Sequence, residues 1–143
     1  MDGTRIERGV RSLLFFESSP DLLPIKGELR KRGFLIFECR TSSEVRFAVA
    51  RFPISLILID LLIPGEPSGY EICRQLREDR QTGSIPIFLF CDHPLPVQVT
   101  QSYFHELKVE RLILPPLDPV YIAQQIDLTL QRHEDPPPPL PRP

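Results

Sequence analysis

The alternation of hydrophobic and polar positions divides the chain into strand-like and helix-like segments. Short apolar runs predict five strands, at residues 11–16, 34–39, 54–59, 85–90 and 109–114. The third run, ISLILI, is nearly continuous and rich in β-branched residues. Such a run is typical of a strand that is buried on both faces of a parallel sheet.

Apolar residues at helical spacing follow each of these strands. Capping residues mark four of the helix starts: Ser19 before Pro20, the capping boxes Thr41–Glu44 and Ser68–Glu71, and Asp118 before Pro119. Residues 97–107 carry the weakest helical pattern. The chain therefore repeats a strand–helix unit five times.

Short connections between such units require parallel strands, which right-handed helical crossovers join. We predict an α/β fold, an open doubly wound sheet of five parallel strands with helices on both faces. Five units suit the flavodoxin-like strand order 2-1-3-4-5. The 143 residues fit one domain at 11–132, followed by a proline-rich tail or linker at 133–143.

The tail has an unusual composition, because six of its last eight residues, Pro136 to Pro143, are proline. Such a segment favours an extended polyproline II backbone. It suits a stiff linker, and it also suits a ligand for an aromatic-lined groove. Pro138 and Pro141 form a PxxP pattern, which short proline runs match by chance.

Charge and composition narrow the function classes. The net charge is −2 and both signs are interspersed, which argues against nucleic acid or an anionic membrane as the main partner. No apolar run approaches the roughly 20 residues of a membrane span, and no signal-peptide core precedes Arg11. We expect a soluble, cytoplasmic protein. Cys39, Cys73 and Cys91 are widely spaced in apolar surroundings, which is typical of reduced, buried cysteines.

A binding site in such a sheet lies at the carboxyl ends of the strands. That edge is predicted to gather Glu17 and Ser18, Asp60, Cys91 and Asp92, and Pro115 and Pro116. Asp60 directly follows a fully apolar strand, so it serves either chemistry or the capping of a loop.

Residues 12–132 resemble the CheY-like receiver domain of two-component response regulators. The resemblance is most specific in LILIDLLIPGEPSGYEICRQLR, residues 56–77, where the family's phosphoacceptor falls on Asp60 and its glycine falls one residue late, on Gly69. LLFFESSPDLL matches the acidic motif after strand 1, and LPPLDP matches the Lys-Pro motif after strand 5. The family's cis Lys-Pro bond implies a cis peptide between Pro115 and Pro116.

Most of the chemistry that the resemblance implies is altered in this chain. The family's acidic pair is Glu17 and Ser18, its Ser/Thr is Cys91, its aromatic switch is Leu112, and its Lys is Pro115. We therefore expect a degenerate pseudo-receiver without enzymatic activity. No cofactor is expected beyond a weak Mg²⁺ held by Glu17 and Asp60.

Two functional hypotheses follow, with a third from the fold alone. The first is a phosphorylation-independent module that binds a protein partner, or a second copy, through the face between Val97 and Arg132. Tyr103, Phe104 and Tyr121 are its candidate anchors, although they also suit core positions. The alternative is a working response-regulator receiver that a histidine kinase phosphorylates on Asp60.

The third hypothesis, a flavin or nucleotide site, needs a glycine- or hydroxyl-rich phosphate loop after strand 1. The sequence ESSPD has no glycine there and carries two carboxylates, which repel phosphate. His93 near Cys91 and Asp92 is interpreted as a solvated loop histidine, because two or three clustered donors fall short of a metal's ligand set.

Overall fold

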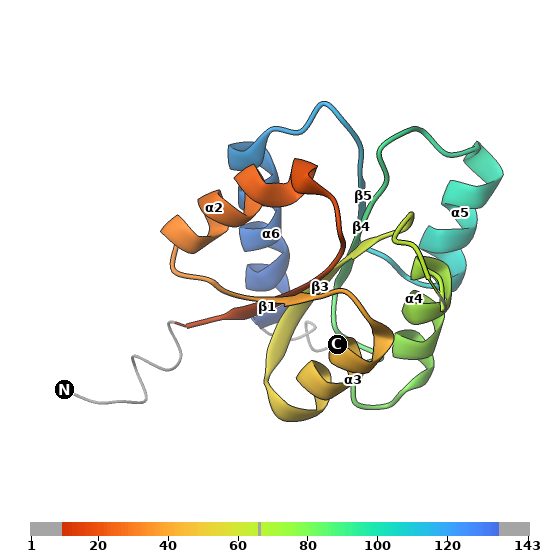
Figure 1. The fold of residues 1–143 in the computed structure, drawn as a ribbon, viewed down its shortest axis with the longest axis horizontal. Helices are drawn as coiled ribbons and strands as arrows, with labels where there is room; N and C mark the ends of the chain where they lie inside the picture. Colours follow the sequence, from red (N-terminus) through yellow and green to blue (C-terminus); the bar gives the residue numbers. More distant parts are fainter. Residues whose placement is uncertain (1–9, 66, 135–143) are drawn as a thin grey trace, which may run out of the picture.

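Five parallel strands form a single sheet in the computed structural model, which describes residues 10–65 and 67–134. The strand order is β2-β1-β3-β4-β5, so the predicted flavodoxin-like topology is confirmed (Figure 1). The strands are β1 (Ser12–Phe16), β2 (Leu35–Cys39), β3 (Ile54–Asp60), β4 (Ile87–Phe90) and β5 (Arg111–Ile113).

Helices cover both faces of this sheet, as expected for a doubly wound fold (Figure 1). One face carries α2 (Leu23–Lys31), which follows the short 3-10 turn η1 (Pro20–Leu22), and α6 (Pro119–Glu134). The other face carries α3 (Ser42–Arg51), α4 (Gly69–Glu78) and α5 (Val97–Glu106).

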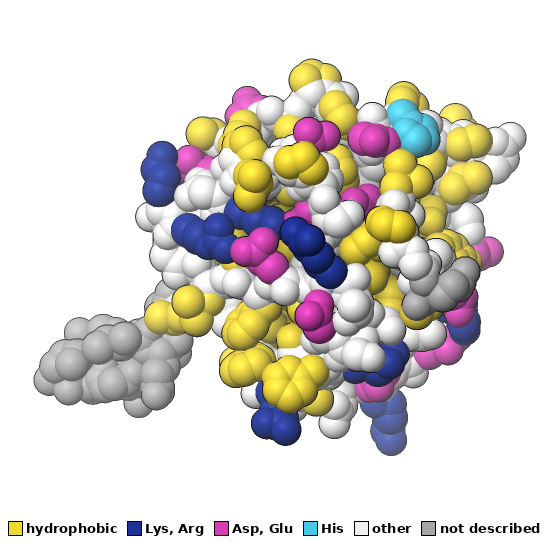
Figure 2. Space-filling view, viewed as in Figure 1, with side chains coloured by type: hydrophobic (Ala, Val, Ile, Leu, Met, Phe, Trp, Pro, Cys, Tyr) yellow, Lys and Arg dark blue, Asp and Glu magenta, His cyan; other side chains and the backbone are white. Residues whose placement is uncertain are grey.

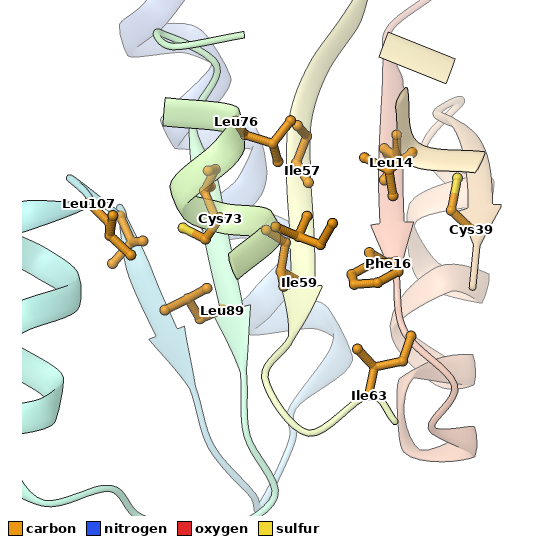
Figure 3. Packing of buried hydrophobic residues seen from close by; sticks show 14 of the residues in the cluster. Leu14, Phe16, Cys39, Ile57, Ile59, Ile63, Cys73, Leu76, Leu89 and Leu107 are labelled. Atoms are coloured by element: carbon orange, nitrogen blue, oxygen red, sulfur yellow. The ribbon is translucent and has the colours of Figure 1, made fainter. Parts of the chain in front are cut away.

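Strand alternation sends successive side chains to opposite faces and so builds two cores. Leu14, Phe16, Ile57 and Ile59 pack under α3, α4 and α5, as Figure 3 shows for part of that cluster. The intervening residues of β1 and β3 pack under α2 and α6. Full burial of each such side chain contributes about 1.5–3 kcal/mol, so the central strands fix the frame of the domain.

The predicted helix caps are present, with two differences. Ser19 accepts the Asp21 N–H at 3.2 Å and so caps the 3-10 turn η1, whereas α2 itself begins at Leu23 without a side-chain cap. Thr41 and Glu44 form the complete capping box, and Asp118 Oδ1 accepts the Tyr121 N–H at 3.1 Å. Ser68 accepts the Glu71 N–H at 3.3 Å, but the Glu71 carboxylate binds Arg74 instead of returning to the cap. The second box is therefore only half formed.

Several element ends differ from the predicted ranges. Strand β4 begins at Ile87 rather than at residue 85, because the Ile85 N–H closes a turn onto Thr82 O. Strand β5 is shortened to three residues, and Lys108 before it has a positive φ of 55°. Helix α6 continues through His133 to Glu134; the rest of the proline-rich tail lies outside the described residues.

Arg77, in the last turn of α4, joins two loops, which lead into the amino-terminal ends of β4 and β5. Its guanidinium donates to Leu107 O at 2.6 Å, Ile85 O at 2.8 Å, Gly83 O at 3.1 Å and Lys108 O at 3.2 Å. One planar cation with five donors can satisfy all four carbonyls at once. The end of α4 is thus tied to the end of α5.

The described part of the chain contains no helix that is both long and apolar enough to cross a membrane. Cys39, Cys73 and Cys91 are buried and unpaired, which confirms their predicted role as small core residues. Burial raises the pKa of the Cys39 and Cys73 thiols to about 11.

Candidate functional site

Asp60 ends β3 at the carboxyl edge of the sheet, where it is only 5% exposed. Its Oδ1 accepts the Leu62 N–H at 2.9 Å. Burial raises the pKa of Asp60 above its usual value; the Leu62 N–H opposes this, and the negative charges of Glu17 and Asp92 raise it further. The carboxyl group therefore has acidic, partly desolvated surroundings.

Gly69 brings the start of α4 against the backbone of Asp60. A Cβ at this position would lie 2.7 Å from Asp60 O and 3.0 Å from Leu61 Cα, which is too close for any other residue without a shift of the backbone. The path of the loop between β3 and α4 therefore requires a glycine, because only a residue without a Cβ lets the two backbone segments approach so closely. This glycine is the one that the receiver resemblance placed one residue late.

Glu17 follows β1 and is 5% exposed, and both of its carboxylate oxygens have hydrogen-bond partners. Its Oε1 accepts the Ser19 N–H at 2.6 Å, and its Oε2 binds the ammonium group of Lys26 on α2. Lys26 is 2% exposed and also contacts Glu38 Oε1 at 2.7 Å. Glu17 is therefore already paired with a buried cation, the ammonium group of Lys26.

The remaining predicted site residues bring little charge to this edge of the sheet. Ser18 is exposed, and its backbone amide favours the ionised form of Asp60. Cys91 is fully buried after β4, and Leu112 is half-buried on β5. Pro115 and Pro116 are exposed, and the peptide bond between them is cis, as the resemblance implies.

The resemblance to receiver domains implies a magnesium ion at this edge of the sheet. Mg²⁺ demands an octahedral set of oxygen ligands, with at least one or two free carboxylates. Glu17 is engaged by Lys26 and Ser19, and one oxygen of Asp60 accepts Leu62 N–H. The donor set does not fit Mg²⁺, in contrast to the expectation that Glu17 and Asp60 hold it weakly.

Cys91, Asp92 and His93 bring three ligand-type atoms within 4.8 Å of one another in the described part of the chain. His93 Nδ1 lies 2.7 Å from Asp92 Oδ1, and both side chains are exposed. A tetrahedral metal centre needs a fourth ligand, so this geometry remains consistent with a solvated loop histidine.

Lys26 is the site residue that the sequence interpretation missed. It continues the stripe Leu22, Ile25 and Leu29 at helical spacing, and that stripe faces the core. A lysine within an apolar stripe signals a buried cation that needs an acidic partner. Tyr103, for which the sequence suggested either an interface anchor or a core position, is 7% exposed and packs in the core.

No protein-family model matches the chain. Two curated relatives do: a probable cyclic di-GMP phosphodiesterase of Vibrio cholerae, 29% identical over 53% of this chain, and the DNA-binding response regulator MtrA of Mycolicibacterium smegmatis, 28% identical over 76% of it. The chain spans only 17% and 45% of the lengths of these two proteins.

Solved structures match over nearly the whole described domain. A signal receiver domain of a histidine kinase from Syntrophus aciditrophicus has a TM-score of 0.70 and 28% identity, with 85% of this chain and 91% of that one covered. A CheY-like receiver domain protein from Methanospirillum hungatei has a TM-score of 0.73 and 17% identity, with 87% and 97% covered.

The strand order, the acidic edge around Asp60 and these similarities define the class of the chain. It has the fold of a CheY-like response-regulator receiver domain, and it is similar to the domains of this kind that two-component signal-transduction proteins carry.

Proposed function

We propose that the domain acts as a pseudo-receiver, which transmits a signal by binding another protein and without a phosphorylated Asp60. It has no catalytic activity of its own in this proposal. The ion pair of Glu17 with Lys26 carries the argument, because an internal ammonium group already neutralises the carboxylate that metal binding would use.

The electrostatics around Asp60 support the same conclusion. The negative charges of Glu17 and Asp92 raise the pKa of its carboxyl group, and the Lys26 ammonium is already paired with Glu17 and Glu38. Pro115 stands where the family's lysine is expected and brings no charge. An acyl phosphate would add further negative charge, and loss of one stabilising group in such a site costs about 3–4 kcal/mol.

A phosphorylation assay on the whole chain tests this proposal. Acetyl phosphate or beryllofluoride with Mg²⁺ is added to the wild type and to Asp60→Asn, and intact mass or ¹⁹F NMR detects the adduct. We expect no adduct on Asp60 within minutes. A stable adduct in the wild type that is lost in Asp60→Asn would establish the alternative, a receiver that a histidine kinase phosphorylates.

A gain-of-function variant provides the matched control. Ser18→Asp with Pro115→Lys restores one metal-ligand carboxylate and one cation at the edge of the pocket. Lys26→Met added to this pair releases Glu17 from its internal partner. We expect beryllofluoride binding to rise across this series, which would show that the missing groups, and not the fold, limit the chemistry.

For the partner surface we propose the face of α5, β5 and α6, between Val97 and Arg132. Exposed hydrophobic side chains on this face support the proposal: Val97, Val99, Tyr121 and Leu128. Phe104 is half-buried there, so Tyr121, at 52% exposure, replaces Tyr103 as the aromatic anchor. Truncation of such an anchor commonly costs 2 kcal/mol or more, about a 30-fold loss of affinity.

Light scattering across a concentration series tests whether this face forms a homodimer. A dimer that Tyr121→Ala dissociates, while Leu23→Ala on α2 does not, would place the interface on this face. A monomer at all concentrations leaves a different protein as the partner, and a dimer that Tyr121→Ala leaves intact would contradict the assignment.

A further inference from the structure

An aromatic groove lies on the side of the molecule remote from the proposed partner face. Phe37 on β2 and Phe47 and Phe52 at α3 line it, and Glu38 and Glu44 lie at its rim. Its volume is about 450 Å³, within the range of ligand-binding pockets. Figure 2 shows hydrophobic side chains gathered over α3, with acidic side chains beside them.

The exposure of these aromatic rings is unusual for core-forming residues. Phe47 is 55% exposed and Phe52 is 41% exposed. Phe37 and Phe52 stack with ring centroids 4.5 Å apart, which fixes two flat walls at the edge of the sheet. Phe47 packs its ring under the guanidinium of Arg51 at 4.7 Å. Flat, rigid aromatic surfaces of this kind bind proline-rich segments in polyproline II conformation.

The chain itself contains such a segment at Pro136–Pro143, outside the described residues. Its sequence, PPPPLPRP, combines a PxxP pattern with one basic residue, Arg142. Proline-rich segments pay little entropy on docking, because their backbone is already restricted. Arg142 complements the negative charge of Glu44 in the lining of the groove, whereas Glu38 is already paired with Lys26 and Arg30.

The end of α6 brings this segment within reach of the groove. Arg11 Nη1 lies 3.7 Å from the Glu134 carboxylate, and Arg11 O accepts the Leu35 N–H at the start of β2. Phe37 lies two residues further along that strand, about 7 Å at the usual rise. Eight residues in polyproline II span about 25 Å, which is enough to pass the strand ends and cover the aromatic rings.

We propose that the aromatic groove of Phe37, Phe47 and Phe52 binds the proline-rich segment Pro136–Pro143 of the same molecule. The prolines stack on the aromatic rings, and Arg142 pairs with Glu44. This contact covers the exposed β2 edge of the sheet and stands independently of the phosphorylation state of Asp60.

NMR relaxation of the full chain tests this proposal, because Leu140 and Arg142 are the only residues of the segment with backbone N–H groups. In the wild type we expect order parameters above about 0.6 for both amides. Phe47→Ala, or the pair Pro138→Ala and Pro141→Ala, should lower both values below that level. Leu23→Ala removes an equally exposed apolar side chain from α2 and should leave them unchanged.

Three results would overturn the proposal. Low order parameters in the wild type would mean that the segment is not docked. Values that Phe47→Ala leaves unchanged would place the segment elsewhere. Values that fall on dilution would mean that the groove binds the segment of a second copy and not its own. Amide shifts of α3 and β2 in every variant report that the domain has remained folded.

Discussion

Removal of the buried cation offers the sharpest test of the site. Lys26→Met preserves the length and apolar stem of the side chain but leaves the Glu17 carboxylate with the Ser19 N–H as its remaining hydrogen-bond donor. The two side chains are 3% and 5% exposed, so water cannot replace the lost ammonium group without a rearrangement. Breaking a buried pair in this way costs about 3–5 kcal/mol.

The converse change should cost less, because the two partners are not equally supported. In Glu17→Gln, Lys26 keeps its contact with the half-exposed Glu38 at 2.7 Å, and we expect a loss of about 1–2 kcal/mol. The double variant Glu17→Gln/Lys26→Met removes both charges and should recover much of the loss. Lys31→Met, on the exposed side of the same helix, should change stability by less than about 0.5 kcal/mol.

Urea unfolding followed by circular dichroism measures all four variants. A loss of 3–5 kcal/mol corresponds to a fall in Tm of about 10–20 °C for a domain of this size. If Lys26→Met cost less than about 1 kcal/mol, like an exposed ion pair, the buried pair would not exist in solution. If Lys26→Met failed to fold, recovery in the double variant would still identify the stranded carboxylate as the cause.

Three further predictions follow from the same structure. Gly69→Ala should destabilise the domain by about 1–3 kcal/mol in urea unfolding, because the added Cβ meets the Asp60 backbone. Gly27→Ala has open space in α2 and should stabilise the domain by up to about 1 kcal/mol. Equal effects of the two substitutions would contradict the close approach of Gly69 to Asp60. Because the pKa of Asp60 is raised in the folded protein, the wild type loses stability as the pH rises through that pKa. Asp60→Asn should therefore be more stable than the wild type at pH 7 and lose this advantage below the usual carboxylate pKa. A gain in stability that persists in acid would contradict the raised pKa. Cys39 and Cys73, with pKa values of about 11, should resist alkylation at pH 8 until urea unfolds the protein, and rapid labelling of the native state would contradict their burial.

The sequence determined the strands best where burial dominates. The continuous apolar run of β3 could belong only to a strand covered on both faces, and it is covered. The ends of β4 and β5 were less predictable, because turns such as the one from Ile85 to Thr82 depend on which backbone groups the loops leave free. The half-formed cap at Ser68 reflects competition by Arg74, which the capping pattern does not encode.

The site shows the limit of the same reasoning. The sequence placed Asp60 and Glu17 at one edge because topology alone brings strand ends together. The sequence did not reveal the role of Lys26, because this role depends on the carboxylates of Glu17, after β1, and Glu38, on β2. Only the packed structure brings these two groups to α2. The sequence left Tyr103 open between an interface anchor and a core position, because residues 97–107 have a weak pattern. In the structure its ring packs edge-on against Tyr70 at 5.3 Å.

The two ends of α5 are held unequally. At the end of α5, Arg77 Nε donates a hydrogen bond to Leu107 O at 2.6 Å, whereas Pro96 begins the helix without a side-chain cap. The end of α5 is therefore fixed to α4, whereas its first turn, which follows the loop after Asp92, has no side-chain cap. Ten residues span about 15 Å, so a tilt of one degree about the fixed end would move the first turn by about 0.26 Å.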